Sequence, residues 1–445
     1  MTARLLDGSD GPLGRRAPSA VGAAGAVHAA GSVGGGVGGW WAVDEPVASP
    51  AAFRRRRWHI IGSDRHPAAA GLLARSAGMR PALGPEPPYP AATAVLLGDR
   101  FGWRDNAMLL DGVAAARRDG GRLVLVHTGA GGASLLRVAA KELARLEVMA
   151  IELPADPAPR AVRVAIALAC DDRVAGTDLL VHADGLVTRQ RWQPVDLPAP
   201  PVPLPATSTA RCVLVTGGLG GLGIRVAAVL SAVYRLHPVL LDATTPAELS
   251  TDAAGYLARL RRGGTGVTVR TTDVTDADGV AAALSTVDTA PIVGVVHCAG
   301  LLQGRPLDRF TSHDLAVAQL VKVDGLRNVL AAVDRRRLRH LITFGSITAE
   351  TPHRSMASYA LANELLRRET LRAARELPVA ATVAAQWSLW SGAGMAHQAG
   401  AVSQARRMGM IPVSLRAGTS ALLRLLSWPA GPEHAAALIL QGQRA

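Results

Sequence analysis

The sequence predicts an α/β fold built from two doubly wound parallel sheets. From Trp58 onward, short apolar runs alternate with amphipathic stretches, and a second set of such runs begins at Arg211. A proline-rich stretch, DLPAPPVPLPATSTA, separates the two sets and is typical of a linker. A chain of 445 residues is long enough for two compact domains, so we expect one domain for each set.

Composition and pattern define the expected boundaries. Residues 1–50 are rich in Gly and Ala without a period, which predicts a disordered tail. A structural domain is expected over 51–195, the linker over 196–210 and the second domain over 211–445. In the structural domain, the stretch DLLVHADGLVTRQRWQPV predicts an antiparallel pair with its turn at Asp184-Gly185.

The formal net charge of +13 raises the question of an acidic partner. The dense basic runs, Arg54–Arg57 and Arg335–Arg337, lack interleaved aromatic residues, and the other arginines are dispersed among carboxylates. This distribution argues against nucleic-acid binding and leaves a solvated surface or an acidic protein partner.

Cysteine usage and hydropathy bear on the compartment. The three cysteines lack metal-ligand spacing and are expected to be buried thiols in a reducing cytosol, so no metal site is predicted. The first residues do not form a signal peptide and no apolar run reaches membrane-spanning length. We therefore expect a cytoplasmic protein without membrane attachment.

A glycine loop at the start of the second domain predicts a dinucleotide site. An apolar strand, Cys212–Val215, leads directly into TGGLGGLG and then into an amphipathic helix. Such glycines let the backbone approach a pyrophosphate, whose charge meets the free N–H groups at the start of the helix. The expected contacts are Thr216, Gly217, Gly218, Leu219, Gly220, Gly221 and Leu222.

Later strand ends supply further expected cofactor contacts. The next strand ends at Asp242, the segment VTVRTTDVTD supplies Asp273 and Val274 for the adenine, and GVVHCAG places Ala299 and Gly300 beside the nicotinamide ribose. A second glycine turn, RLVLVHTGAGGASLL in the first domain, is interpreted as a weaker signal, on the expectation that no acidic residue follows at the required place on the next strand. We interpret that turn as a packing feature.

Residue usage points to a catalytic set. Only two of the 48 Lys and Arg residues are Lys, so a lysine at 322 suggests a need for an ammonium group. Ser346 ends a predicted strand, Tyr359 begins a helix, and Asn363 follows one turn later. Reduction of a ketone needs a proton donor, and a phenol serves if nearby positive charge lowers its pKa. We expect Tyr359 to donate that proton, Ser346 to bind the carbonyl oxygen and Asn363 to order the proton path.

These motifs resemble the short-chain dehydrogenase/reductase family. The lysine of that family usually lies four residues after the tyrosine, whereas Asn363 stands there and Lys322 lies upstream. This exchanged placement is similar to the ketoreductase domains of modular polyketide synthases and animal-type fatty acid synthases. The resemblance implies two Rossmann-like subdomains, the first without a cofactor, reduction of a β-keto group by NADPH, and a substrate lid after WSLWSGAGMA.

Three departures from the family pattern leave points open. The Leu-Asp-Asp signature of one stereochemical class would fall at Leu302-Gln303-Gly304, and the Trp of the opposite class at Thr351; both are absent, so the alcohol configuration is open. The arginine that holds a 2′-phosphate is replaced by Asp242-Ala243. An aspartate there favours the free ribose of NADH, although Arg225 could still reach a phosphate.

The expected partner is an acyl carrier protein or polyketide synthase that presents the substrate. No carrier, ketosynthase or acyltransferase segment is found, so a free-standing ketoreductase for antibiotic-type polyketide biosynthesis is predicted, and its positive charge suits an acidic carrier. Two alternatives remain. Asp242 favours an NAD-linked alcohol dehydrogenase acting on a released metabolite, and a non-catalytic scaffold that retains the dinucleotide fold is the other.

Overall fold

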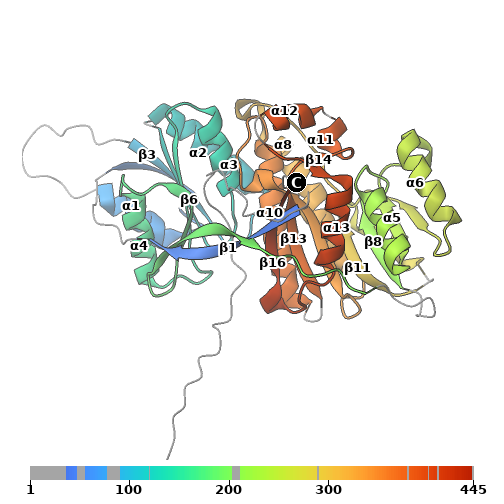
Figure 1. Ribbon diagram of the computed structural model, residues 1–445. Coiled ribbons are helices and arrows are strands. Elements are labelled where there is room, and N and C mark those ends of the chain that lie inside the picture. Colours follow the sequence, from blue (N-terminus) through green and yellow to red (C-terminus); the bar gives the residue numbers. More distant parts are fainter. Residues whose placement is uncertain are drawn as a thin grey trace, which may run out of the picture.

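The computed structural model describes residues 37–47, 56–77, 91–119, 121–202, 211–287, 290–377, 380–398, 400–407 and 410–442. Most of the predicted tail (1–36 and 48–50) and of the linker (203–210) lies outside these ranges. The described chain forms an N-terminal half, residues 37–202, and a C-terminal half, residues 211–442, which stand side by side in Figure 1.

The N-terminal half contains a parallel sheet with helices on both faces. Its strands are rich in buried aliphatic residues, as expected for a parallel sheet covered on both sides. Strand β7 (Val187–Val195) pairs antiparallel with β6, and the predicted turn contains Gly185 at φ 83°. The elements are β2 (Arg57–Ile61), β3 (Ala91–Leu97), β4 (Arg122–His127), β5 (Glu147–Glu152), β6 (Gly176–Val181), α1 (Pro67–Ala77), α2 (Trp103–Asp119), α3 (Ala133–Glu142) and α4 (Pro159–Ala169).

The described C-terminal half contributes seven parallel strands in the order β10-β9-β8-β11-β12-β13-β16. The strand order reverses between β8 and β11, and ligands of such sheets bind at this point. The strands are β8 (Cys212–Thr216), β9 (His237–Asp242), β10 (Thr268–Thr271), β11 (Ile292–His297), β12 (His340–Ser346), β13 (Ala381–Trp387) and β16 (Ala436–Gly442).

Helices cover both faces of this sheet (Figure 1). Helices α5 and α13 pack on one face, and α7, α9 and α10 on the other. The helices are α5 (Gly223–Tyr234), α6 (Thr251–Arg262), α7 (Ala277–Ser285), α8 (Ser312–Gln319), α9 (Gly325–Ala332), α10 (Ala357–Ala373), α11 (Met395–Gln398), α12 (Ala401–Arg407) and α13 (Leu415–Leu425). Strands β14 (Trp390–Ser391) and β15 (Val413–Ser414) pair with each other in a separate small sheet.

The α/β fold with parallel sheets is confirmed, but the two expected sheets form a single sheet of 14 strands. Strand β1 (Val37–Pro46) joins them by pairing antiparallel with both β7 and β16. The predicted disordered tail over residues 1–50 is thus wrong for residues 37–46, which form this strand. Its glycines concealed the strand pattern, and its partners lie far away in the sequence. Insertion of β1 satisfies the edge N–H and C=O groups of both halves.

The two halves also share a hydrophobic core. Leu136 on α3 and Leu109 on α2 pack in one buried cluster with Leu315 on α8 and Leu361 on α10. Separate clusters fill the remaining faces of each half. Because the shared cluster contains residues from both halves, each half depends on the other for burial of its apolar surface.

We expect Leu315→Ala to lower the free energy of unfolding by about 2 to 5 kcal/mol, since this fully buried leucine would leave a cavity in the shared core. Thermal unfolding followed by circular dichroism measures the loss. Leu186→Ala, at a leucine that is 48% exposed, is the matched control and should change little. Two separate unfolding transitions in the wild type would contradict a shared core.

Candidate active site

A glycine loop connects β8 to α5 where the strand order reverses. Gly217 has φ 60°, and the N–H of Gly220 donates to its carbonyl at 3.1 Å, which closes a tight turn. A Cβ on Gly223 would collide with the same carbonyl, so the start of α5 needs a glycine. Among the described residues no side chain caps this end of α5. The helix can therefore receive an anion, and a dinucleotide pyrophosphate fits the loop.

Asp242, at the end of β9, holds this loop in place. One carboxylate oxygen accepts from the N–H of Leu219 at 2.9 Å, and the other accepts from the N–H of Thr244 at 2.9 Å. Arg225, the residue that could have reached a 2′-phosphate, donates to the Gly221 carbonyl and pairs with Asp252. Asp242, the acidic residue expected to contact the cofactor, thus lies beside the loop, whereas Arg225, which could have bound a 2′-phosphate, is already paired with Asp252.

The remaining expected cofactor contacts lie at the same edge of the sheet. Ala299 is buried, and its N–H donates to the Thr216 hydroxyl at 3.3 Å. Gly300 lies against Lys322, whose Cε and Nζ are both 2.9 Å from the position a Cβ would take. Asp273 is exposed beyond β10 and accepts from the N–H of Thr275. Val274 is buried, and its carbonyl accepts from Asn328 at 2.9 Å.

His297 bridges Thr216, at the start of the glycine loop, and the backbone of Lys322. Its Nδ1 lies 2.8 Å from the Thr216 hydroxyl, and its Nε2 lies 3.0 Å from the Lys322 carbonyl oxygen. Burial and the charge of Lys322 lower the pKa of His297 to about 3, so the ring is neutral. A neutral ring accepts from Thr216 and donates to Lys322. His297 is not among the site residues predicted from the sequence; its adjacency to Cys298-Ala299-Gly300 was the available signal for this bridging position.

Lys322 lies on a one-turn π-helix, Leu320–Asp324, between α8 and α9. Such turns are frequently found at functional sites. The side chain is 2% exposed, and its Nζ donates to the Phe344 carbonyl at 2.9 Å and to the Ala299 carbonyl at 3.5 Å. Burial lowers the pKa of Lys322 to about 8, while Cys298 partly opposes the shift.

Ser346, Tyr359 and Asn363 come together at the end of β12 and the first turns of α10. Tyr359 hydrogen-bonds with Ser346 and with Asn363, and its ring centroid lies 5.9 Å from Nζ of Lys322. The Asn363 amide also donates to the Tyr359 carbonyl at 2.6 Å. The structure therefore groups the four residues of the predicted catalytic set. Their catalytic roles stay predictions.

The electrostatics of Tyr359 differ from the expectation. Burial raises the pKa of Tyr359, and the hydrogen bonds with Ser346 and Asn363 only partly oppose it. We expected nearby positive charge to lower this pKa, but desolvation of the phenolate dominates in the chain alone. The phenol consequently keeps its proton at neutral pH, as a proton donor must.

An aromatic cluster anchors the segment that follows β13. Trp387 lies 5.3 Å from Phe344 and 4.9 Å from Trp390 between ring centroids. Beyond it, Gly392 and Gly394 have positive φ, and the short helices α11 and α12 follow. The lid predicted from WSLWSGAGMA remains a prediction for these helices.

Comparison with known proteins identifies part of the C-terminal half. Residues 212–392 match the model of the KR domain. Polyketide synthase GfsA of Streptomyces halstedii is 32% identical over 58% of this chain, and erythronolide synthase EryA3 of Saccharopolyspora erythraea is 32% identical over 49%. The chain spans 3% and 7% of the lengths of these two relatives.

Solved structures share the fold of both halves. The ketoreductase from the first module of phoslactomycin biosynthesis in Streptomyces sp. HK803 has a TM-score of 0.69 at 22% identity, covering 92% of this chain and 94% of its own. A ketoreductase domain from the bacillaene assembly line has a TM-score of 0.71 at 19% identity, covering 92% and 98%.

The described residues offer neither a membrane-spanning helix nor a metal site. None of the helices described is both long and apolar enough to cross a bilayer. No group of three or more His, Cys, Asp or Glu side chains in the described ranges is arranged to hold a metal ion.

Proposed function

We propose, from the premise that residues 212–392 are a KR domain, that this chain is a nicotinamide-dependent ketoreductase acting on the β-keto group of a carrier-bound polyketide intermediate. The observation that carries the proposal is the grouping of Lys322, Ser346, Tyr359 and Asn363 beside the glycine loop. This arrangement offers a proton donor, an oxygen-binding hydroxyl and a nearby cation at one point.

The chemistry follows from these groups. When bound, the reduced nicotinamide supplies the hydride that adds to the keto carbon. Ser346 and the Tyr359 phenol hydrogen-bond to the ketone oxygen, and Tyr359 gives its proton to that oxygen as negative charge develops there. The ammonium of Lys322 stabilises the phenolate. The buried Oδ1 of Asn363 has no partner among the described residues, so it can bind a water molecule through which a proton returns to the Tyr359 phenolate.

Tyr359→Phe tests the proton donor directly. We expect kcat for a β-ketoacyl thioester of pantetheine to fall by about 100-fold to 10,000-fold, because the general acid is removed, while affinity for the reduced cofactor stays unchanged. Tyr234→Phe is the matched control: this buried hydroxyl donates to the Pro201 carbonyl and should be dispensable for turnover. An unchanged kcat in Tyr359→Phe would contradict the proposal; loss of activity would exclude the scaffold alternative.

The pH dependence tests the role of Lys322. Since the pKa of Lys322 is about 8, its ammonium is present below that pH and is lost above it. We expect kcat/KM to be level at neutral pH and to decline above about pH 8, approaching about tenfold per pH unit as one group titrates.

The assignment of that decline can be checked because the chain has only two lysines. Labelling lysine Cε with ¹³C should give two signals. Lys141→Arg should remove one of them, so that the remaining signal belongs to Lys322. The midpoint of its titration should match the pH profile. A midpoint near the usual lysine value, with the same decline in kcat/KM, would assign the decline to another group.

We infer that NADH is the preferred cofactor, although the family resemblance implies NADPH. What supports NADH is the Asp242 carboxylate at the end of β9, which would repel a 2′-phosphate, and the engagement of Arg225 with Asp252. The same aspartate keeps open a second function, an NAD-linked alcohol dehydrogenase that acts on a released metabolite. Activity with a pantetheine thioester compared with the corresponding free ketone or alcohol separates the two.

Asp242→Asn combined with Ala243→Arg should raise the ratio of kcat/KM for NADPH to that for NADH by at least about tenfold, equivalent to about 1.4 kcal/mol. The substitution removes the repelling charge and adds a cation at an exposed position. Ala243→Arg alone is the control, because it retains Asp242. A wild type that already prefers NADPH would overturn the inference.

The proposed partner is an acidic acyl carrier protein. The net charge of +13 supports it, since opposite charges speed the encounter of two proteins. The curated relatives are polyketide synthases, in which such a substrate would be carrier-bound.

A further inference from the structure

The N-terminal half contains a second glycine turn in the position of a dinucleotide loop. Gly129–Gly132 follows β4 and leads into α3, as the glycine loop of the C-terminal half follows β8 and leads into α5. Gly132 is the N-cap of α3, has φ 114° and provides no side chain to accept from the first N–H groups. Such a helix end requires an acceptor from elsewhere.

Glu364 of α10 provides that acceptor. Its two carboxylate oxygens accept from the N–H of Gly132 at 3.1 Å and from the N–H of Ser134 at 2.8 Å. The side chain is fully buried. A Cβ on Gly131 would lie 2.9 Å from the carboxylate and 2.7 Å from Nε of Arg368, so the turn admits these groups only because it is glycine. The carboxylate thus lies where an anion binds at a helix N-terminus.

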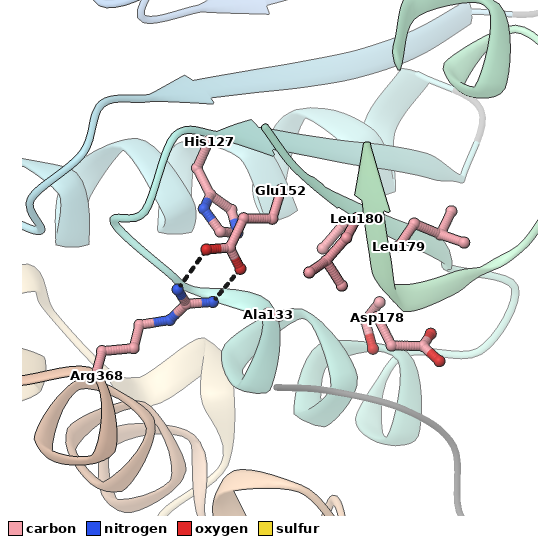
Figure 2. A pocket seen from close by; sticks show the side chains of 9 residues that line it. His127, Ala133, Glu152, Asp178, Leu179, Leu180 and Arg368 are labelled. Carbon is pink, nitrogen blue, oxygen red and sulfur yellow. Dashed lines mark hydrogen bonds and ion pairs between the residues drawn. The ribbon is translucent and has the colours of Figure 1, made fainter. Parts of the chain in front are cut away.

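Charge complementarity fixes the carboxylate there. Burial alone would raise the pKa of Glu364, but Arg368, Arg137 and Arg367 together with a hydrogen bond from Ser134 lower it to about 2. Arg368 also pairs with both oxygens of Glu152, at 3.0 and 2.9 Å. Figure 2 shows Arg368 reaching from α10 to Glu152 at the end of β5, next to His127.

The same helix carries the catalytic groups. Asn363 directly precedes Glu364, and Tyr359 lies little more than one turn earlier. A further contact joins the segment after Ser346 to α3: Arg137 donates to the Ala349 carbonyl. The N-terminal half therefore holds α10 next to the residues that are expected to meet the substrate.

We propose that Glu364 is a positioning residue whose carboxylate, bound at the N-terminus of α3, fixes the placement of α10 and so of Tyr359 and Asn363 against the ketone. This inference rests on the proposed reductase function. The glycine turn of the N-terminal half then serves as a receptor for the catalytic helix, in the place where its counterpart in the C-terminal half receives a cofactor.

Chemical rescue of Glu364→Ala tests the proposal. The atoms removed have the size of an acetate ion, and the vacated site keeps its arginines and N–H groups. We expect kcat to fall by about 100-fold, as misplacement of a reacting group by about 1 Å can cause, with the KM for cofactor unchanged. Added acetate should restore kcat with a saturable dependence, whereas equal concentrations of chloride should not.

Two further variants keep the test sharp. Glu364→Gln retains the shape but not the charge, so it should fold, show a smaller loss and gain nothing from acetate. Glu369→Gln changes the same helix where it pairs with Arg327 and Arg372, away from α3, and should keep its kcat. An unchanged kcat in Glu364→Ala, or a loss that acetate does not restore in folded protein, would overturn the proposal.

Hydrogen exchange separates this proposal from the proposed function. Amides of residues 359–363 should exchange faster in Glu364→Ala, and acetate should restore their protection. If the wild type reduces no ketone but Glu364→Ala shows the faster exchange that acetate reverses, the proposed function fails and the anchoring of α10 by Glu364 stands. If exchange is the same in both proteins, the anchoring itself is refuted.

Discussion

The arrangement of the site depends on how helix α10 is held between the two halves of the chain. Along this helix, Tyr359 and Asn363 belong to the predicted catalytic set, while Glu364 and Arg368 reach into the N-terminal half. Glu364 and Arg368 are buried, and each of their charges is paired or hydrogen-bonded within a medium where an unpaired one would be costly. A displacement of α10 would break the pairing at one end and move the phenol at the other.

The two halves use one structural device for different purposes. Each has a strand, a glycine turn and a helix whose N-terminus attracts an anion. In the N-terminal half the anion is the Glu364 carboxylate, which belongs to the chain itself. In the C-terminal half no side chain among the described residues caps α5, and Asp242 holds the loop from behind. We infer that the first device supports the catalytic helix and the second binds the cofactor.

Local patterns in the sequence predicted much of the fold and the grouping of the site. Alternating apolar runs gave the helices and strands, and the strand before TGGLGGLG placed the loop. The strand β1 was missed because glycines interrupt its pattern and because pairing with β7 and β16 is non-local. Glu364 and Arg368 were missed for a similar reason: on a helix their spacing resembles an ordinary surface pair, and only the fold brings Gly131 against them.

The most direct test of this division between the halves is the stoichiometry of cofactor binding, measured by calorimetric titration of the full chain with NADH and with NADPH. One equivalent per chain is expected, because the glycine turn of the N-terminal half is filled and the loop of the C-terminal half is open. Two equivalents would show that Glu364 does not fill the first site, and no binding would contradict a cofactor site between β8 and α5.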